Sequence, residues 1–121
     1  LKFIKNLLNN KGKLIIEVPY AKDLLLNNDL SSFKEFTFWS EHLVLHTKNT
    51  LKKFITDAGF SNIKILNYQR YNLDNHFKWF IQGKPGGHNA PLFKTSKEAK
   101  NNYENFLIKN DCSDTIIATA S

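Results

Sequence analysis

The chain has 121 residues, a net charge of +6, and 41% hydrophobic and 13% aromatic side chains. This composition predicts one packed domain, or part of one, and excludes a chain that is mainly disordered. The longest apolar run is far shorter than the roughly 20 residues that span a bilayer, so no membrane partner is expected.

The single cysteine, Cys112, excludes an internal disulfide framework and indicates a reducing compartment, so we expect a cytoplasmic protein. The excess of 17 basic over 11 acidic residues favours an anionic small-molecule partner. The lysines are scattered and no basic run is longer than Lys52-Lys53, so nucleic acid is not expected as a partner. The chain opens on Leu1 and contains no methionine, from which we expect a piece of a longer protein.

The first third of the chain is predicted to place a strand between helices. Residues 1–8 carry their apolar side chains on one side of a helix. The apolar run 14–18, bounded by breakers, is typical of a strand buried on both faces. A short helix is expected over 21–26. The aromatic segment 33–39 has no clean period and is interpreted as a loop or broken helix that packs over the sheet edge.

The clearest helical pattern in the chain runs from Thr47 to Phe60. Thr47 can cap its start, and Gly59 supplies the left-handed residue of a Schellman-type end. A stripe at helical spacing lies between them: Leu51, Phe54, Ile55 and Ala58. A strand is expected next, over 63–71.

The rest of the chain predicts a helical excursion and a final strand. Residues 73–93 suggest one or two helical turns that end in a Gly- and Pro-rich run. The T-x-x-E sequence that begins at Thr95 has the form of a capping box and predicts a further helix. The run 115–120 is apolar on both faces and is therefore expected at the centre of the sheet.

Taken in order, several of these pieces resemble the C-terminal half of a class I S-adenosylmethionine-dependent methyltransferase. They are the Gly12-turn strand, the pair Glu41-His42, and the helix that ends in Ala58-Gly59-Phe60. The resemblance implies that the closing strand lies antiparallel between the other two. We therefore expect an α/β fold: a fragment of a Rossmann-like mixed sheet of about three strands in the order first, third, second, with flanking helices. Residues 1–121 would be the C-terminal portion of the domain, with a helical insertion over about 73–110.

The later segment Arg70-Tyr71-x-Leu73-x-Asn75-His76-x-x-Trp79 is similar to members of the family associated with sugar or surface-polysaccharide methylation. The resemblance implies the substrate-side half of a methyltransferase that acts on a sugar, a nucleotide sugar or a similar small molecule. The Gly-rich loop that holds S-adenosylmethionine in the family is absent, so the cofactor is expected to bind upstream of residue 1. The alternative is a non-catalytic interaction module in which the aromatic segment 33–39 and the excursion 73–93 form a homodimer surface. Separately, one edge of the first strand is expected to lack a neighbouring strand, so the chain should dimerise or aggregate through that edge.

The segment from Trp39 to His42 resembles the Tyr-x-Glu-His element of sugar C-methyltransferases, with Trp39 in the place of Tyr. The resemblance implies that His42 takes part in proton transfer, for which histidine is suited near neutral pH. Glu41 would orient the imidazole or contact a hydroxyl, and Trp39 would contact substrate. The alternative is a histidine that only supports the loop. His42 and His46 are four residues apart, but no third ligand is evident, so no metal site is predicted.

A second set of candidates combines a guanidinium, an amine, imidazoles and aromatic faces, which suit a phosphorylated sugar or a nucleotide. This substrate-binding set consists of Arg70, Tyr71, His76, Trp79, Lys84 and His88. The alternative for these residues is a structured lid or a subunit contact.

Overall fold

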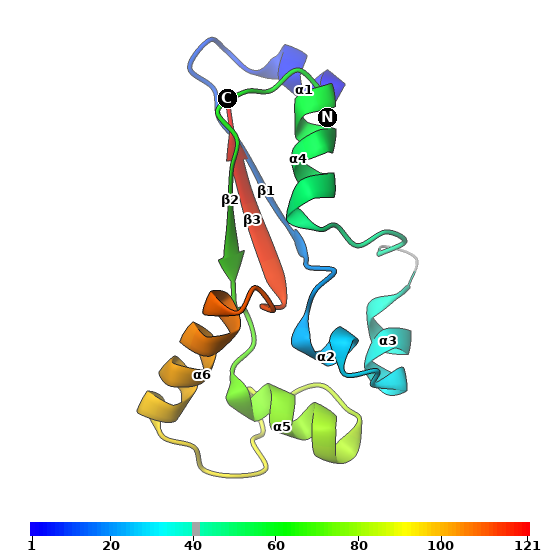
Figure 1. Cartoon of the computed structure of the whole chain (residues 1–121), viewed down its shortest axis with the longest axis vertical. Helices are drawn as coiled ribbons and strands as arrows, with labels where there is room; N and C mark the ends of the chain where they lie inside the picture. The colour runs from blue at the N-terminus through cyan, green and yellow to red at the C-terminus, as the bar shows by residue number, and fades with distance from the viewer. Residues whose placement is uncertain (40–41) are drawn as a thin grey trace.

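The computed structural model of the chain describes residues 1–39 and 42–121, and it is a mixed α/β structure (Figure 1). In chain order its elements are α1 (Lys2–Leu7), β1 (Leu14–Pro19), α2 (Leu24–Asn27), α3 (Ser31–Thr37), α4 (Lys48–Asp57), β2 (Lys64–Tyr68), α5 (Leu73–Gln82), α6 (Lys97–Lys109) and β3 (Thr115–Ala120). None of the helices in the described ranges is long and apolar enough to cross a membrane.

The three strands form one sheet in the order β1-β3-β2. β3 is antiparallel to both neighbours, and Ala118 lies opposite Ile16 of β1 and Ile65 of β2. This confirms the predicted strand order, the antiparallel last strand and its central position. β1 and β2 therefore run in the same direction, and their carboxyl ends meet at one end of the sheet.

Helix α4 covers one face of the sheet and forms the main core with it (Figure 1). Ile55 and Ile116 are fully buried there. The helix has the predicted ends: the Thr47 hydroxyl accepts the backbone N–H of Thr50, and the N–H of Phe60 donates to the carbonyl of Ile55. Such caps satisfy backbone groups that the helix itself leaves unpaired, and they explain why the sequence pattern located this helix correctly.

The opposite face of the sheet is open, which corrects the expectation of a first strand buried on both faces. Ile15 of β1 and Leu66 of β2 are each 70% exposed. Successive side chains of a strand point to opposite faces, so Leu14 and Ile16 face α4 while Ile15 points away from it. Within the described ranges, no helix packs on that second face.

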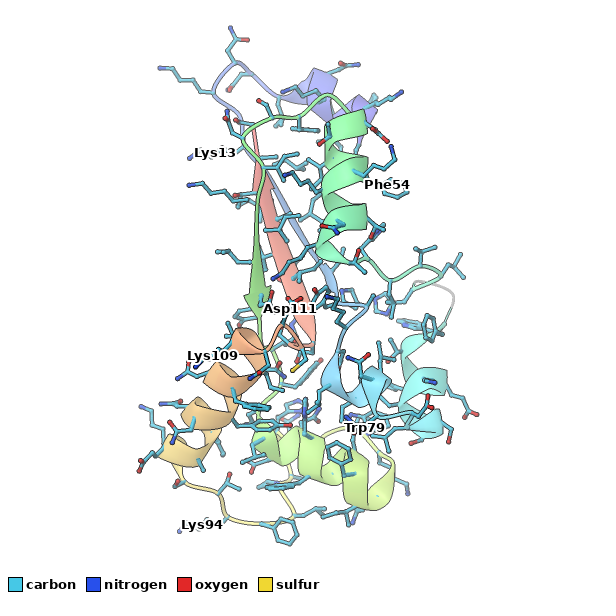
Figure 2. All side chains as sticks on the ribbon, viewed as in Figure 1. Lys13, Phe54, Trp79, Lys94, Lys109 and Asp111 are labelled. Atoms are coloured by element: carbon cyan, nitrogen blue, oxygen red, sulfur yellow. The ribbon has the colours of Figure 1, made fainter. Side chains whose placement is uncertain are left out.

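Helices α2, α3, α5 and α6 lie beyond the carboxyl ends of β1 and β2, whereas α1 lies at the opposite end of the sheet (Figure 1). α2, α3 and α5 form a separate apolar cluster around Leu25, Phe33 and Trp79, the last of which is labelled in Figure 2. The aromatic segment of 33–39 was wrongly expected to be irregular, because most of it lies in the regular helix α3. Its Phe33 ring contacts Trp79 of α5, with centroids 4.9 Å apart, and does not pack over the sheet edge.

Helix boundaries in this part also differ from the prediction. α2 begins at Leu24, after the capping carboxylate of Asp23, and α5 runs for ten residues. The predicted cap at Thr95 is wrong by one position: Ser96 caps α6, and the Thr95 hydroxyl donates to the buried carboxylate of Asp74. A tertiary partner on α5 thus removes Thr95 from the capping role that its sequence context suggested.

Candidate functional site

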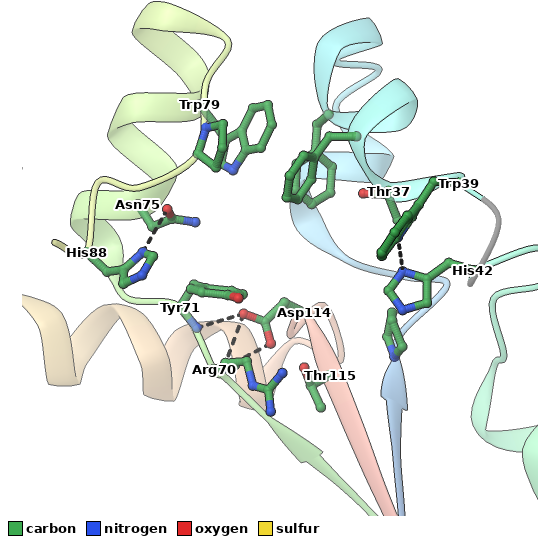
Figure 3. A pocket seen from close by; sticks show the side chains of 14 residues that line it. Thr37, Trp39, His42, Arg70, Tyr71, Asn75, Trp79, His88, Asp114 and Thr115 are labelled. Carbon is green, nitrogen blue, oxygen red and sulfur yellow. Dashed lines mark hydrogen bonds between the residues drawn. The ribbon is translucent and has the colours of Figure 1, made fainter. Parts of the chain in front are cut away.

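The structure contains a pocket of about 510 Å³ where the carboxyl ends of β1 and β2 meet the helices α3 and α5 (Figure 3). Its volume is within the range of small-molecule sites. The side chains that line it are Pro19, Phe33, Phe36, Thr37, Trp39, His42, Arg70, Tyr71, Asn75, Trp79, Pro85, His88, Asp114 and Thr115. The pocket is therefore assembled from five separate stretches of the chain.

Most of the candidates predicted from the sequence meet in this pocket. They are Trp39, His42, Arg70, Tyr71, Trp79 and His88. His76 and Lys84 do not line it. Glu41 lies outside the described residues, so its predicted role stays a prediction.

Asp114 sets the geometry at the end of β2. Its carboxylate accepts the backbone N–H groups of Arg70 and Tyr71, each at 2.9 Å (Figure 3). It also accepts the side-chain amide N–H of Gln69 at 2.8 Å. Burial raises the pKa of the Asp114 carboxyl, and the N–H donors of Arg70 and Tyr71 oppose that rise. The result is a chain turn that holds Arg70 and Tyr71 at the rim of the pocket.

Arg70 reaches across the open face of the sheet to β1. Its Nη2 atom lies 2.7 Å from Oε1 of Glu17, and both side chains are partly exposed. A guanidinium has five N–H donors, so this contact leaves donors that can face a ligand. The ion pair orients the guanidinium at the pocket rather than neutralising all of its hydrogen-bonding capacity.

One wall of the pocket is aromatic. Phe33 and Phe36 of α3 contact the Trp79 ring at centroid distances of 4.9 and 5.1 Å. Trp79 and Phe33 are buried, whereas Phe36 is exposed at the mouth. This arrangement provides apolar surface for a ring-shaped ligand next to the polar groups at the strand ends.

The two histidines of the pocket have different hydrogen-bond partners. The Trp39 indole N–H donates to Nδ1 of His42 at 3.1 Å. On the opposite side, Nδ1 of His88 lies 3.3 Å from Oδ1 of Asn75, and the His88 ring packs near Tyr71 at 5.0 Å between centroids (Figure 3). Both imidazoles are thus held at Nδ1.

The loop that carries His88 is attached to the first turn of α5. Oδ1 of Asn75 accepts the backbone N–H groups of Gly86 and Gly87 at 3.1 and 3.2 Å. A Cβ atom on Gly87 would lie 2.1 Å from the carbonyl oxygen of Asp74, so only glycine permits this close approach.

His76 has a structural position behind the pocket, although its sequence context suggested substrate contact. It is 2% exposed, with Nδ1 2.9 Å from the Tyr103 hydroxyl and Nε2 3.3 Å from the Gln69 amide. Burial lowers the pKa of His76 to about 4, so its imidazole is neutral at pH 7. It links α5 and α6 to Gln69, the residue that also contacts Asp114.

Sequence reasoning missed Asn75 and Asp114, and it selected neither Phe33 nor Phe36 as a site residue. Asp114 precedes the last strand and is distant in sequence from the two N–H groups that it binds, so no local pattern revealed its role. Asn75 belongs to the motif that starts at Arg70, but no role was assigned to its side chain. The close approach at Gly87 gave a weak signal, because adjacent glycines suggest a place where backbones meet.

Comparisons of the chain with protein-family models, with curated proteins and with solved structures found no match.

Proposed function

We propose that this chain forms the acceptor-binding half of an S-adenosylmethionine-dependent methyltransferase, and that the acceptor is a sugar, a nucleotide sugar or a similar small molecule. The observation that carries the proposal is the pocket at the carboxyl ends of β1 and β2, which unites six of the predicted residues. Ligands of open α/β sheets bind outside the carboxyl ends of the strands.

The strand topology supports the same proposal. The order β1-β3-β2, with β3 antiparallel to both neighbours, is the order that the methyltransferase resemblance implies. In this order β3 lies between two strands that precede it in the chain. Fold topology is compatible with many functions, so the pocket residues carry the chemical part of the proposal.

The polar and aromatic groups of the pocket fit such an acceptor. The wall formed by Phe33, Phe36 and Trp79 offers apolar surface for a ring, and Arg70 offers donors for a phosphate or another anionic group. His42 and His88 supply two imidazoles, the side chain that most often acts as a general acid or base. A hydroxyl that becomes methylated must lose its proton, and the pocket provides groups of the required type.

We do not propose that this chain holds the methyl donor by itself. The chain has five glycines, and none of them forms the G-x-G-x-G sequence that the family uses in its donor-binding loop. The proposal therefore assigns acceptor binding and proton transfer to this chain, and donor binding to residues outside it. Those residues would face the pocket from the side that the chain leaves open.

The test is methyl transfer from isotopically labelled S-adenosylmethionine by the natural protein that contains this chain, with sugar phosphates and nucleotide sugars as acceptors. We expect label in one acceptor class, and we expect Arg70→Ala to raise its KM. Lys52→Ala, an exposed change on α4 away from the pocket, is the control that should leave turnover unchanged. Absence of both donor binding and labelled product would exclude the methyltransferase proposal.

The second candidate is a non-catalytic module that associates with a second copy of itself. The open sheet face favours it, because Ile15 of β1 and Leu66 of β2 are exposed there. Outer edges of sheets are also common sites of strand addition. Self-association that depends on these residues, together with absence of methyl transfer, would favour this candidate over the enzyme.

A further inference from the structure

The two histidines that line the pocket require opposite neutral tautomers. For His42 the decisive partner is Trp39, whose indole nitrogen lies 3.1 Å from Nδ1. An indole N–H can only donate, so Nδ1 of His42 must accept. A neutral imidazole has one N–H, and in His42 that proton is therefore on Nε2. His42 presents a hydrogen-bond donor at Nε2.

For His88 the decisive partner is the side-chain amide of Asn75. The backbone N–H groups of Gly86 and Gly87 both donate to one atom of this amide, at 3.1 and 3.2 Å. That atom must be the oxygen, since the amide nitrogen cannot accept. Nδ1 of His88 lies 3.3 Å from the same oxygen and must carry the proton. His88 therefore presents the free lone pair at Nε2.

The loop geometry keeps His88 in this state. Gly87 lies against the backbone of Asp74, where a Cβ atom would meet the carbonyl oxygen at 2.1 Å. This contact and the hydrogen bonds to Asn75 hold the backbone that precedes His88 on the start of α5. The Tyr71 ring packs on the imidazole from the other side. The orientation of His88 is thus determined by contacts on two elements.

We infer that His88, and not His42, accepts the proton from a hydroxyl group of the bound acceptor, an inference that rests on the proposed function. The O–H bond breaks, the proton forms a new N–H bond at Nε2 of His88, and the oxygen keeps the electron pair. The imidazole becomes a cation whose Nδ1–H still donates to Asn75. His42 donates its Nε2–H to the acceptor molecule and helps to position it.

The tautomers can be measured on the chain itself by long-range ¹H–¹⁵N correlation NMR, at a pH where both imidazoles are neutral. We expect the unprotonated, pyridine-type nitrogen to be Nε2 in His88 and Nδ1 in His42. Asn75→Asp keeps the acceptor oxygen and should preserve the His88 tautomer, whereas Asn75→Leu should remove the preference. A neutral His88 with its proton on Nε2 in the unmodified chain overturns the inference, whatever the variants do.

Kinetics in the natural protein separate this inference from the proposed function. His88→Gln cannot accept the proton, and we expect kcat to fall by about 10²- to 10⁴-fold, the usual contribution of a general base. His42→Gln keeps an amide donor and should mainly raise KM. If His42→Gln abolishes turnover while His88→Gln retains it, the inference is overturned and the proposed function stands. If the unmodified protein transfers no methyl group, the proposed function fails and the inference fails with it, whereas a reversed order of the two variants overturns the inference alone.

Discussion

The hydroxyl of Tyr20 donates a 2.9 Å hydrogen bond to the carboxylate of Asp111, a residue 91 positions away in the chain. Tyr20 follows β1 and is buried, and Asp111 lies in the turn between α6 and β3 with a φ of +57°. The same carboxylate contacts Lys48 at 2.7 Å, Lys22 at 3.2 Å and Asn67 at 3.1 Å. These donors hold the pKa of Asp111 well below its usual range, against the opposing effect of burial.

The first prediction concerns this carboxylate. Asp111→Ala leaves the buried Tyr20 hydroxyl without its acceptor and places a poorly suited residue at positive φ. We expect a loss of about 2–3 kcal/mol in the free energy of unfolding, measured by urea denaturation. Asp111→Asn is the matched control, since it keeps an acceptor oxygen and tolerates the left-handed backbone. Equal stability of the two variants would contradict the role assigned to Asp111.

The second prediction concerns the dependence of stability on pH at Asp23. Burial raises the pKa of Asp23 from 3.8 to about 7, and the nearby Asp114 adds to the rise, although the Leu25 N–H opposes it. The folded state therefore binds a proton more tightly than the unfolded state. The stability that protonated Asp23 contributes is complete below about pH 4 and is lost as the pH rises through about 7. Between about pH 4 and 7, this effect changes the free energy of unfolding by a few kcal/mol, and Asp23→Asn should remove that change. Denaturation measured at a series of pH values should then give a flatter plot of unfolding free energy against pH.

The third prediction is a dependence of opposite sign at His76. Burial lowers its pKa from 6.5 to about 4, so the unfolded state binds the proton more tightly. The stability that His76 contributes is present above about pH 6.5 and is lost as the pH falls towards 4. Relative to the unmodified chain, His76→Gln should become more stable on acidification and Asp23→Asn less stable. Difference curves of the same sign for the two variants would contradict these assignments.

The fourth prediction tests the close approach of two backbones at Gly87. Gly87→Ala forces a contact with the carbonyl of Asp74, and we expect a cost of about 1–3 kcal/mol, as for overpacked cores. The loop should then leave Asn75 and release His88. Thermal unfolding and NMR shifts at His88 measure the two effects. Asn89→Ala, an exposed change in the same loop, should leave both unchanged.

The fifth prediction concerns self-association through the open sheet face and the adjoining outer edge of β1. Among residues 1–39 and 42–121, no strand pairs with the outer edge of β1. The pairing nearest to that edge is a single isolated bridge between Tyr20, which follows β1, and His46. We expect concentration-dependent association in sedimentation velocity, and we expect the pair Ile15→Lys and Leu66→Lys to reduce it. Leu43→Lys makes the same chemical change at another exposed site and should have no effect. A monomer at all concentrations would remove the dimer from consideration.

The local sequence determined those elements whose ends depend on nearby residues. Thr47 and Gly59 define α4 because a cap and a left-handed residue act within one helical turn. The β-branched and apolar run of 115–120 identified β3, and its central position in the sheet was also predicted correctly. The motif residues Arg70 and Tyr71 line the pocket, and their contact with a substrate stays a prediction.

Only the tertiary structure decided which surfaces meet. Ile15 is as apolar as Ile16, but it is exposed because alternate side chains of β1 point away from α4. Thr95 has the sequence of a helix cap, yet it pairs with Asp74, since a partner from another helix competes with the local backbone. His42 and His88 are the same residue type, but Nδ1 of His42 lies against a donor-only indole and Nδ1 of His88 lies against an amide oxygen. The local sequence indicates the chemistry that a side chain can perform. Its protonation state and its exposure depend on neighbours that are distant in the sequence.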